Sequence, residues 1–182
     1  MFHLNTEQLI DYWRARRGGA AVPNRAAINP TEFSNLLPQI VILGRADVGQ
    51  YHFRLVGGFI ADLHGRDLRQ DNMMRLWRSE DRTQLQLAIE AARRRGEPLV
   101  VDCDAHPQSG PAMRMEVTLA PLIGPSGEID RLIGLYQPLS PVSGLMGRAA
   151  LSLSVRAITT PGAAHEAFPP LRLAAVGGQR IA

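Results

Sequence analysis

Apolar and polar positions recur with two different periods along this chain, and the changes of period mark the predicted elements. Near the start, Leu9, Ile10 and Trp13 lie on one stripe at helical spacing. Thr6 precedes this stripe and can serve as the N-cap. The pattern predicts an amphipathic opening helix.

A linker rich in Gly, Ala and Pro covers residues 18–30, and a short helix that stops before Pro38 follows it. From there the texture changes, because residues 39–45 and 51–57 are β-branched and aromatic runs separated by a turn-rich stretch. These two runs predict an antiparallel hairpin.

The clearest helix covers residues 79–95, with acidic residues at its start and the run Arg93 to Arg95 at its end. Three further strands are predicted at 97–105, 111–122 and 129–139, separated by Gly- and Pro-containing breaks. In the second of them, apolar and polar residues alternate strictly, which is typical of a strand with one buried face.

After Pro138 the pattern decays, and residues 140–182 are expected to form an irregular, flexible tail. Within the tail, residues 145–158 fit an amphipathic helix or a strand equally well. The expected organisation is therefore a helix and linker at 1–28, a domain at 29–139 and the tail.

The length of 182 residues fits one domain with appendages, and 45% hydrophobic with 20% charged residues is the composition of a folded protein. All 20 basic residues are arginine, and the net charge of +3 names no partner. The single cysteine, Cys103, excludes an internal disulfide. With no secretory signal and no apolar run of about 18 residues, the chain is expected to be cytoplasmic, without a membrane partner.

The order of helix, two strands, short helices, a longer helix and three strands is the succession of a PAS domain. Two stretches, DYWRARRGGAAVPNRAAINPTEFSNLLPQIVILG and YHFRLVGGFIADLHGRDLRQDNM, resemble a small bacterial family of stand-alone PAS proteins. The resemblance covers about residues 7–139. It implies an α+β fold, with a five-stranded antiparallel sheet and helices on one face. Gly58 departs from the polar residue expected after "LVG", which puts a hydrogen bond there in doubt.

This resemblance implies a non-enzymatic sensory or regulatory module of signal transduction. Stand-alone members act by contacting other signalling proteins, so the output would come from a partner. A homodimer is also expected, in which the stripe of Leu9, Ile10 and Trp13 pairs two chains. The alternative is that this helix folds back and covers its own sheet.

A second function hypothesis is a sensor of small molecules. The alternating strands and the short helices predict an apolar pocket for a small apolar ligand between sheet and helices. The candidate lining residues are Phe53, Leu55, Phe59, Leu63, Met115 and Val117. An enzyme or a nucleic-acid-associated protein is the third hypothesis.

Cofactor chemistry finds little support in the sequence. Haem-binding PAS domains usually take a histidine from the longer helix, which here has none. His64 is interpreted as a cap or a solvated side chain rather than a ligand. Cys103 is interpreted as a small buried hydrophobe rather than a reactive thiol. We expect no bound cofactor.

Asp102 and Asp104, near His106, could form a metal site or an acid–base pair, but a solvated sheet face explains them more simply. Residues 65–68 are interpreted as a turn with local pairing, and the Arg93 to Arg95 run as a complement to the helix dipole. No catalytic residue, metal site or nucleic-acid partner is therefore expected.

Overall fold

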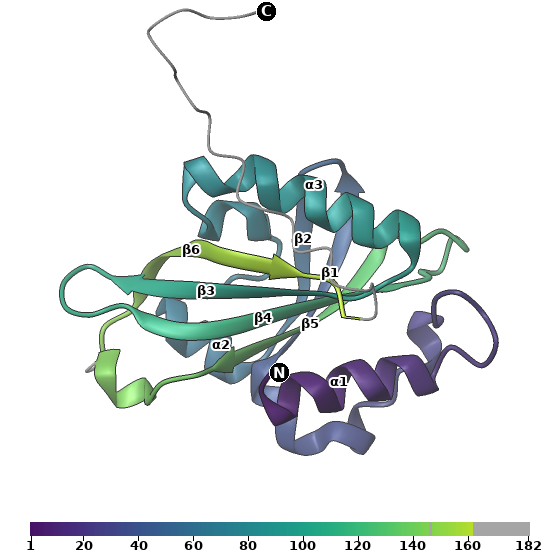
Figure 1. The fold of residues 1–182 in the computed structure, drawn as a ribbon, viewed down its shortest axis with the longest axis horizontal. Coiled ribbons are helices and arrows are strands. Elements are labelled where there is room, and N and C mark those ends of the chain that lie inside the picture. Colours follow the sequence, from purple (N-terminus) through teal and green to yellow (C-terminus); the bar gives the residue numbers. More distant parts are fainter. Residues whose placement is uncertain (146, 162–182) are drawn as a thin grey trace, which may run out of the picture.

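The computed structural model describes residues 1–145 and 147–161 as one mixed α/β body (Figure 1). Up to residue 138, the longer helices and strands occur in the order predicted from the sequence. The helices, including the short 3₁₀ turns labelled η, are α1 (Leu4–Ala15), η1 (Arg25–Ala27), η2 (Pro30–Gln39), α2 (Gly58–His64), η3 (Met73–Leu76), α3 (Ser79–Arg95) and η4 (Val142–Leu145). The strands are β1 (Ile40–Asp47), β2 (Gln50–Val56), β3 (Leu99–Pro107), β4 (Met113–Leu122), β5 (Arg131–Pro138) and β6 (Ala150–Thr159).

All six strands form one antiparallel sheet in the order β2-β1-β5-β4-β3-β6. The expected α+β class and antiparallel sheet are confirmed. The sheet, however, has six strands instead of five, because β6 arises within the stretch that was assigned to the irregular tail. Leu153 and Ile158 of this strand point into the core and are buried, which explains why the ambiguous segment becomes a strand. Residues 162–182 of the expected tail lie outside the described part.

Each edge strand of the sheet has a backbone hydrogen bond to another segment of the chain. At β2, the Phe53 N–H donates to the Asp71 carbonyl at 3.1 Å. At β6, the Leu153 carbonyl accepts from the Arg78 N–H at 2.9 Å.

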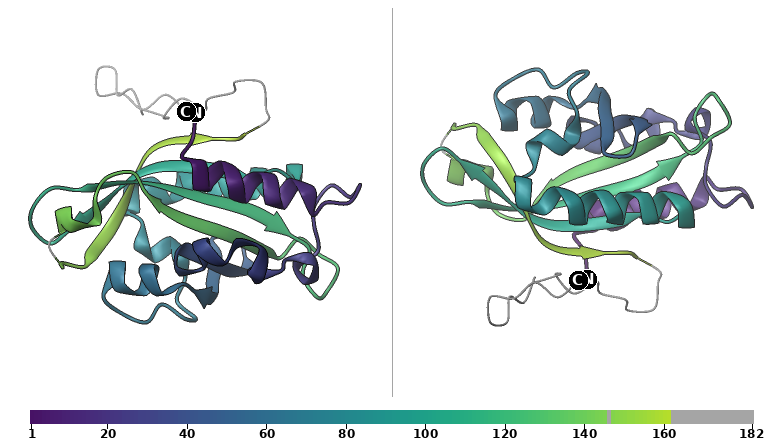
Figure 2. Two further views of the ribbon diagram at one scale, coloured as in Figure 1. Left: turned by 90° about the horizontal axis from the view of Figure 1, so that it is seen from below. Right: turned by 90° about the horizontal axis from the view of Figure 1, so that it is seen from above.

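Side chains from the sheet form two separate cores. The "α3 face" carries the larger one, packed against α2, η3 and α3, with Trp77 and Ile89 among its buried members. The "α1 face" carries the smaller core, in which Leu9 and Trp13 of α1 and Phe33 of η2 pack on the sheet. Figure 2 shows α1 and α2 on opposite sides of the strands. The expectation that helices cover only one face is therefore wrong.

The opening helix begins earlier than its sequence pattern predicts. His3 is the N-cap, and its Nδ1 accepts from the Asn5 N–H at 3.1 Å. Thr6 consequently lies inside the helix and is completely buried. No helix in the described ranges is long and apolar enough to cross a membrane.

The packing of α1 yields a first prediction. Trp13 is 1% exposed, and its Nε1 donates to the Pro121 carbonyl at 2.7 Å. Trp13→Ala is expected to lower the free energy of unfolding by about 3–5 kcal/mol, because it removes a buried aromatic side chain. The control Leu4→Ala, on the same helix at 74% exposure, is expected to change it by no more than about 0.5 kcal/mol. Urea unfolding measures both, and similar values for the two variants would contradict the observed docking.

Candidate functional site

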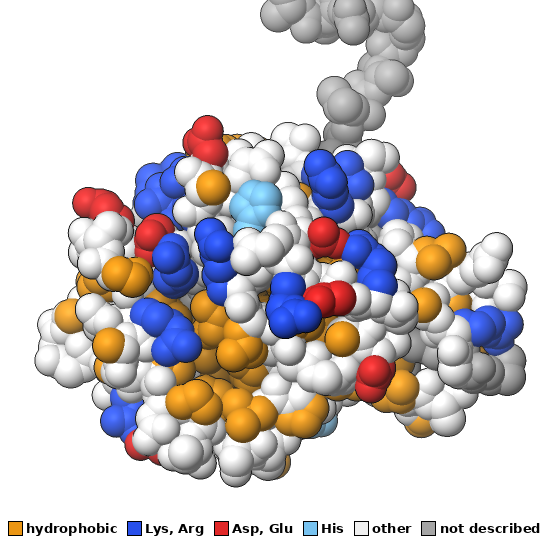
Figure 3. Space-filling model, turned by 180° about the vertical axis from the view of Figure 1, so that it is seen from behind, with side chains coloured by type: hydrophobic (Ala, Val, Ile, Leu, Met, Phe, Trp, Pro, Cys, Tyr) orange, Lys and Arg blue, Asp and Glu red, His pale blue; other side chains and the backbone are white. Residues whose placement is uncertain are grey.

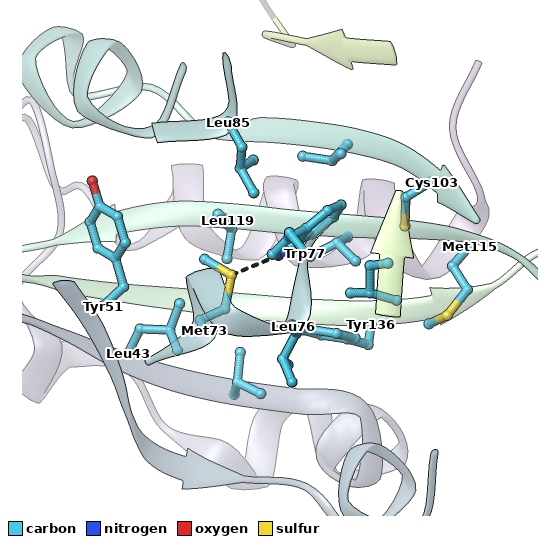
Figure 4. Close-up of a cluster of buried hydrophobic side chains, with 14 of the residues drawn as sticks. Leu43, Tyr51, Met73, Leu76, Trp77, Leu85, Cys103, Met115, Leu119 and Tyr136 are labelled. Carbon is cyan, nitrogen blue, oxygen red and sulfur yellow. Dashed lines mark hydrogen bonds between the residues drawn. The ribbon is translucent and has the colours of Figure 1, made fainter. Parts of the chain in front are cut away.

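Five of the six predicted pocket residues lie in the core of the α3 face. Phe53, Leu63, Met115 and Val117 are buried there, and Phe59 is partly buried against it. The core side chains come from both layers and surround Trp77, whose Nε1 donates to Met73 Sδ at 3.0 Å (Figure 4). The structure thus brings these five residues into one packed cluster.

Leu55 does not join this cluster and is 41% exposed. Phe53 pairs with Leu43, but the register shifts there, and Leu55 pairs with Ile42. Arg54 is thereby the extra residue of a β-bulge, and the strand turns Leu55 to the α1 face. The simple alternation assumed along β2 placed Leu55 on the wrong face. One inserted residue moves every later side chain of the strand to the opposite face of the sheet.

Two of the buried polar side chains that lack a hydrogen-bond partner among residues 1–145 and 147–161 are Tyr136 and His64. The Tyr136 hydroxyl lies in the core of the α3 face, fully buried, and burial raises the pKa of this phenol well above its ordinary value. His64 at the end of α2 is also buried. Its Nδ1 lies 2.9 Å from the Ala150 carbonyl, whereas its Nε2 is unpartnered.

His64 is therefore neither a cap nor a solvated side chain, in contrast to the sequence-based interpretation. Burial lowers the pKa of His64, and the nearby positive charge of Arg66 lowers it further. The hydrogen bond to the Ala150 carbonyl acts in the opposite direction but is outweighed. A neutral imidazole that donates from Nδ1 leaves a lone pair on Nε2 inside the protein.

Cys103 is completely buried on the α3 face, as its alternation in the strand predicted. Burial raises the pKa of its thiol well above the ordinary value, and the carboxylates of Asp102 and Asp104 add to the shift. Since the thiolate is the reactive form, the side chain acts as an apolar core residue.

A buried carboxylate ties α3 to the first two strands. Glu90 accepts from Tyr51 Oη at 2.6 Å, from Arg45 Nε at 2.8 Å and from Arg93 Nη2 at 3.0 Å. Burial opposes ionisation, but these three donors outweigh it and hold the pKa of Glu90 below its ordinary value. The network fixes α3 on the sheet.

Strands β3, β4 and β6 carry a "polar strip" on the α1 face, defined as Asp102, Asp104, Arg114 and Arg156. Arg114 Nη2 donates to both Asp102 oxygens at 2.9 and 2.7 Å, and Arg156 Nη1 donates to Asp104 at 3.0 Å. Arg114 and Arg156 are about half exposed, so the strip forms part of the surface. These pairs match the interpretation of the aspartates as a polar sheet face.

His106 next to the strip bonds Ser154 Oγ through Nε2 at 2.7 Å and does not join the aspartates. In the part of the chain that the structure describes, no three His, Cys, Asp or Glu side chains could together hold a metal ion.

The turn after α2 has the local pairing expected for residues 65–68. Asp67 accepts from the backbone N–H of Arg69 at 2.9 Å and pairs with its guanidinium, and Arg66 pairs with Asp71. The guanidinium of Arg69 and its backbone N–H lower the pKa of Asp67 to about 2. Gly57 caps α2 without a side-chain hydrogen bond, which fits the absence of a polar residue at Gly58.

The three residues predicted to pair two chains are buried in their own protomer. Leu9, Ile10 and Trp13 are at most 2% exposed, and Leu9 and Trp13 belong to the core of the α1 face. The helix thus takes the alternative left open by its sequence and covers its own sheet. Its apolar stripe is satisfied without a second chain and cannot serve as a dimer interface while the helix is docked.

A depression and a groove hollow the surface formed by residues 1–145 and 147–161. Hydrophobic side chains line a depression on the side of the molecule turned away from α1, with charged side chains around it (Figure 3). A groove of about 370 Å³ also lies between the β3–β4 turn and the segment after β5. It is lined by Pro111, Ala112, Met113, Ser140, Pro141 and Ser143, none of which belongs to the predicted pocket.

Comparison with known proteins adds a family match. The family model of the PAS domain matches residues 1–137, whereas no curated protein matches this chain. Similar solved structures include a light-oxygen-voltage domain studied with a flavin analogue, at 14% identity and TM-score 0.48 over 64% of this chain and 87% of that one. The LOV domain of the blue-light photoreceptor Aureochrome1 is 18% identical, with TM-score 0.47 over 64% and 86%. With TM-scores below 0.5, these structures resemble the chain only loosely.

The Glu90 network predicts a pH-dependent stability. Because its pKa is lowered on folding, Glu90 stabilises the fold above its ordinary pKa of 4.5, and this contribution disappears as the pH falls through the lower folded value. Glu90→Gln is expected to lose about 3 kcal/mol at neutral pH. Urea unfolding at several pH values should show this loss shrinking in acid, with exposed Glu128→Gln as the control. A loss that stays constant into acid would contradict the ionised network.

Proposed function

The chain belongs to the PAS domain family, and we propose on this premise that it is a regulatory module that acts through contacts with signalling proteins. A PAS fold suggests a sensory signalling module. The partner contacts, the site of action in the cytoplasm and the absence of enzymatic activity are parts of the proposal.

The observation that carries the proposal is the distribution of polar groups on the sheet. The α3 face is occupied by a packed apolar core, and both edges are engaged by other segments. On the opposite face, Arg114 and Arg156 present half-exposed guanidinium groups beside Asp102 and Asp104. Alternating charges on a rigid sheet can fix the orientation of a bound partner and select which partner binds. A partner with a mismatched charge pattern would leave charges unpaired.

A homodimer remains part of the proposal, but it requires another surface than the apolar stripe of α1. The polar strip is a candidate, since its alternating arginines and aspartates are complementary to an inverted copy of themselves.

A sensor of small molecules is the second candidate function. The unpartnered Tyr136 hydroxyl favours it, because buried polar groups normally have partners. This hydroxyl lies in the same core as Phe53, Met115 and Val117, which were predicted to line a pocket. A small ligand with one polar group would satisfy the hydroxyl.

Charge reversal on the polar strip tests the first function. The double variant Arg114→Glu with Arg156→Glu is expected to reduce capture of the signalling partner from the native cells at least about tenfold, since it puts like charges together. Arg94→Glu, at an exposed position on α3, is the matched control and should leave capture unchanged. Quantitative mass spectrometry of the captured proteins measures the effect. Equal capture by all three proteins would refute a partner surface on the strip.

Tyr136→Phe separates the two functions. In a module without a core ligand, removing an unsatisfied buried hydroxyl is expected to raise the free energy of unfolding by about 1 kcal/mol. If the hydroxyl holds a co-purifying ligand, the variant instead melts lower and loses the corresponding mass in native mass spectrometry. Thermal melting with native mass spectrometry decides between these outcomes.

A further inference from the structure

Strand β6 is held in place by two different parts of the molecule. On one side it pairs with β3, and Arg156 reaches Asp104 of the polar strip at 3.0 Å. On the other side it meets segments of the α3 face, where the Leu153 carbonyl accepts from the Arg78 N–H at 2.9 Å. The position of this strand, and with it one arginine of the polar strip, therefore depends on the helices of the α3 face.

A buried histidine attaches the start of β6 to the end of α2. His64 is 6% exposed, and its Nδ1 lies 2.9 Å from the carbonyl of Ala150, the first residue of β6. A carbonyl oxygen can only accept a hydrogen bond, so Nδ1 carries the proton of the neutral ring. Nε2 then carries the lone pair, and it has no partner among the residues that the structure describes. The joint between α2 and β6 is thus built for the neutral form of the ring.

The closed joint has no place for a second proton on this ring. The proton would make Nε2 a buried N–H group without an acceptor in the described ranges, which costs free energy. It would also put a positive charge inside the protein, near the positive charge of Arg66. Protonation therefore favours a state in which Nε2 reaches water, and separation of α2 from the start of β6 provides that access.

The charged groups around His64 do not compensate for this cost. Helix α2 packs against η2 and β6. The charged residues of these elements and of the adjoining turns are Asp62 on α2, Glu32 on η2, Arg156 on β6, Arg148 before β6, and Arg66, Asp67, Arg69 and Asp71 after α2. Of these, Arg66 is the one whose charge acts on the ring, and it adds to the effect of burial in holding the pKa of His64 below its ordinary value of 6.5. The joint is therefore closed above pH 6.5 and loses stability as the pH falls below it.

The pairing of β6 with β3 is irregular in the stretch next to this joint. The register between the two strands shifts at Leu151 and again at Arg156, so each is the extra residue of a β-bulge. A bulge disrupts the ladder locally, which makes the stretch from Ala150 to Arg156 depend on its contacts with the α3 face. Loss of the histidine contact is thus expected to loosen this stretch, and Arg156 at its end then loses its fixed orientation towards Asp104.

A second histidine, His106, lies against the same stretch from the α1 face. Its Nε2 bonds Ser154 Oγ at 2.7 Å. Burial and the charge of Arg78 lower the pKa of this ring, whereas the carboxylates of Asp104 and Asp81 act in the opposite direction. A protonated ring can still donate to the serine hydroxyl. Protonation here keeps the contact with β6, so the response to pH is assigned to the buried histidine.

We propose that His64 is a proton sensor in the joint between α2 and β6, where protonation of Nε2 in mild acid opens the joint, loosens β6 up to Arg156 and thereby weakens the polar strip. The inference rests on the function proposed above and adds a regulatory input to it, because Arg156 belongs to the surface that would contact the partner. At neutral pH the strip is complete, and acidification removes its β6 half.

Nuclear magnetic resonance on the full chain between about pH 7.5 and pH 5 tests the sensor. The ring of His64 is expected to be the Nδ1–H tautomer at the upper end and to titrate with a midpoint below 6.5. The amide signals of residues 150–156 should change with the same midpoint, whereas those of β4 and β5 should not. Hydrogen exchange of residues 150–156, corrected for the intrinsic effect of pH, should become at least about tenfold faster in acid. A midpoint at or above 6.5, or a titration without any change in β6, would overturn the sensor.

Two kinds of variant separate a sensor from a merely structural histidine. His64→Asn keeps a donor for the Ala150 carbonyl but does not titrate, so residues 150–156 should lose their pH response. Arg66→Gln should raise the midpoint by roughly a few tenths of a pH unit, because it removes a positive charge near the ring. Arg69→Gln, in the same turn but without effect on the pKa of His64, is the matched control. A response that persists in His64→Asn, or equal midpoints in the two arginine variants, would overturn the assignment.

The arginine variants keep the experiment decisive if His64→Asn does not fold, because they leave the joint itself unchanged. Partner capture through the polar strip is measured near neutral pH, where the joint is closed. Failure of capture to depend on the strip would therefore count against the proposed function, whereas loss of the pH response would count against the sensor.

Discussion

The two-sided burial of the central strands is the constraint on which the rest of this structure depends. In β4, every residue from Met115 to Leu122 is buried, and in β5 every residue from Leu132 to Gln137. A sheet with apolar side chains on both faces is not stable in water unless both are covered. The chain meets this requirement with α2, η3 and α3 on one side and with α1 and η2 on the other. Removing the helices from either face would therefore expose apolar side chains of the sheet to water.

Local patterns predicted most elements, and the departures have physical causes. Residues 79–95 carry a complete helix signal, and the structure has α3 at Ser79–Arg95. β6 stayed undecided between a helix and a strand because its short Ser and Ala side chains fit either period, and only contact with β3 decides between them. The stripe on α1 showed that this helix must be buried, but a periodic pattern does not say against what. Leu55 was misplaced by a single bulged residue.

The site chemistry was less accessible from the sequence. Glu90 binds Arg45 and Tyr51, which lie 45 and 39 residues away, and no spacing rule connects them. The aspartates of the polar strip were recognised as a sheet face, but their arginine partners come from two other strands. The burial of Glu116 and Thr118 on the α1 face has no signature in the sequence, because both residues simply continue the alternation of β4.

The two faces divide the work of the proposed module. The α3 face contains the Glu90 network and the larger core, which make it the stable part. The α1 face has the smaller core and carries the half-exposed ion pairs of the polar strip, on which the proposed partner contacts depend.

The central claim is that the two faces of the sheet carry separate cores and that the smaller core, on the α1 face, is the less stable one. The two tryptophans report on these cores separately. Trp13 lies in one and Trp77 in the other, both 1% exposed. The measurement is urea unfolding of Trp77→Phe and Trp13→Phe, with fluorescence and far-ultraviolet circular dichroism recorded on the same sample. The account predicts that the fluorescence of Trp13 changes at lower urea than the circular dichroism, whereas the Trp77 signal coincides with it. Coincident transitions in both variants would contradict it.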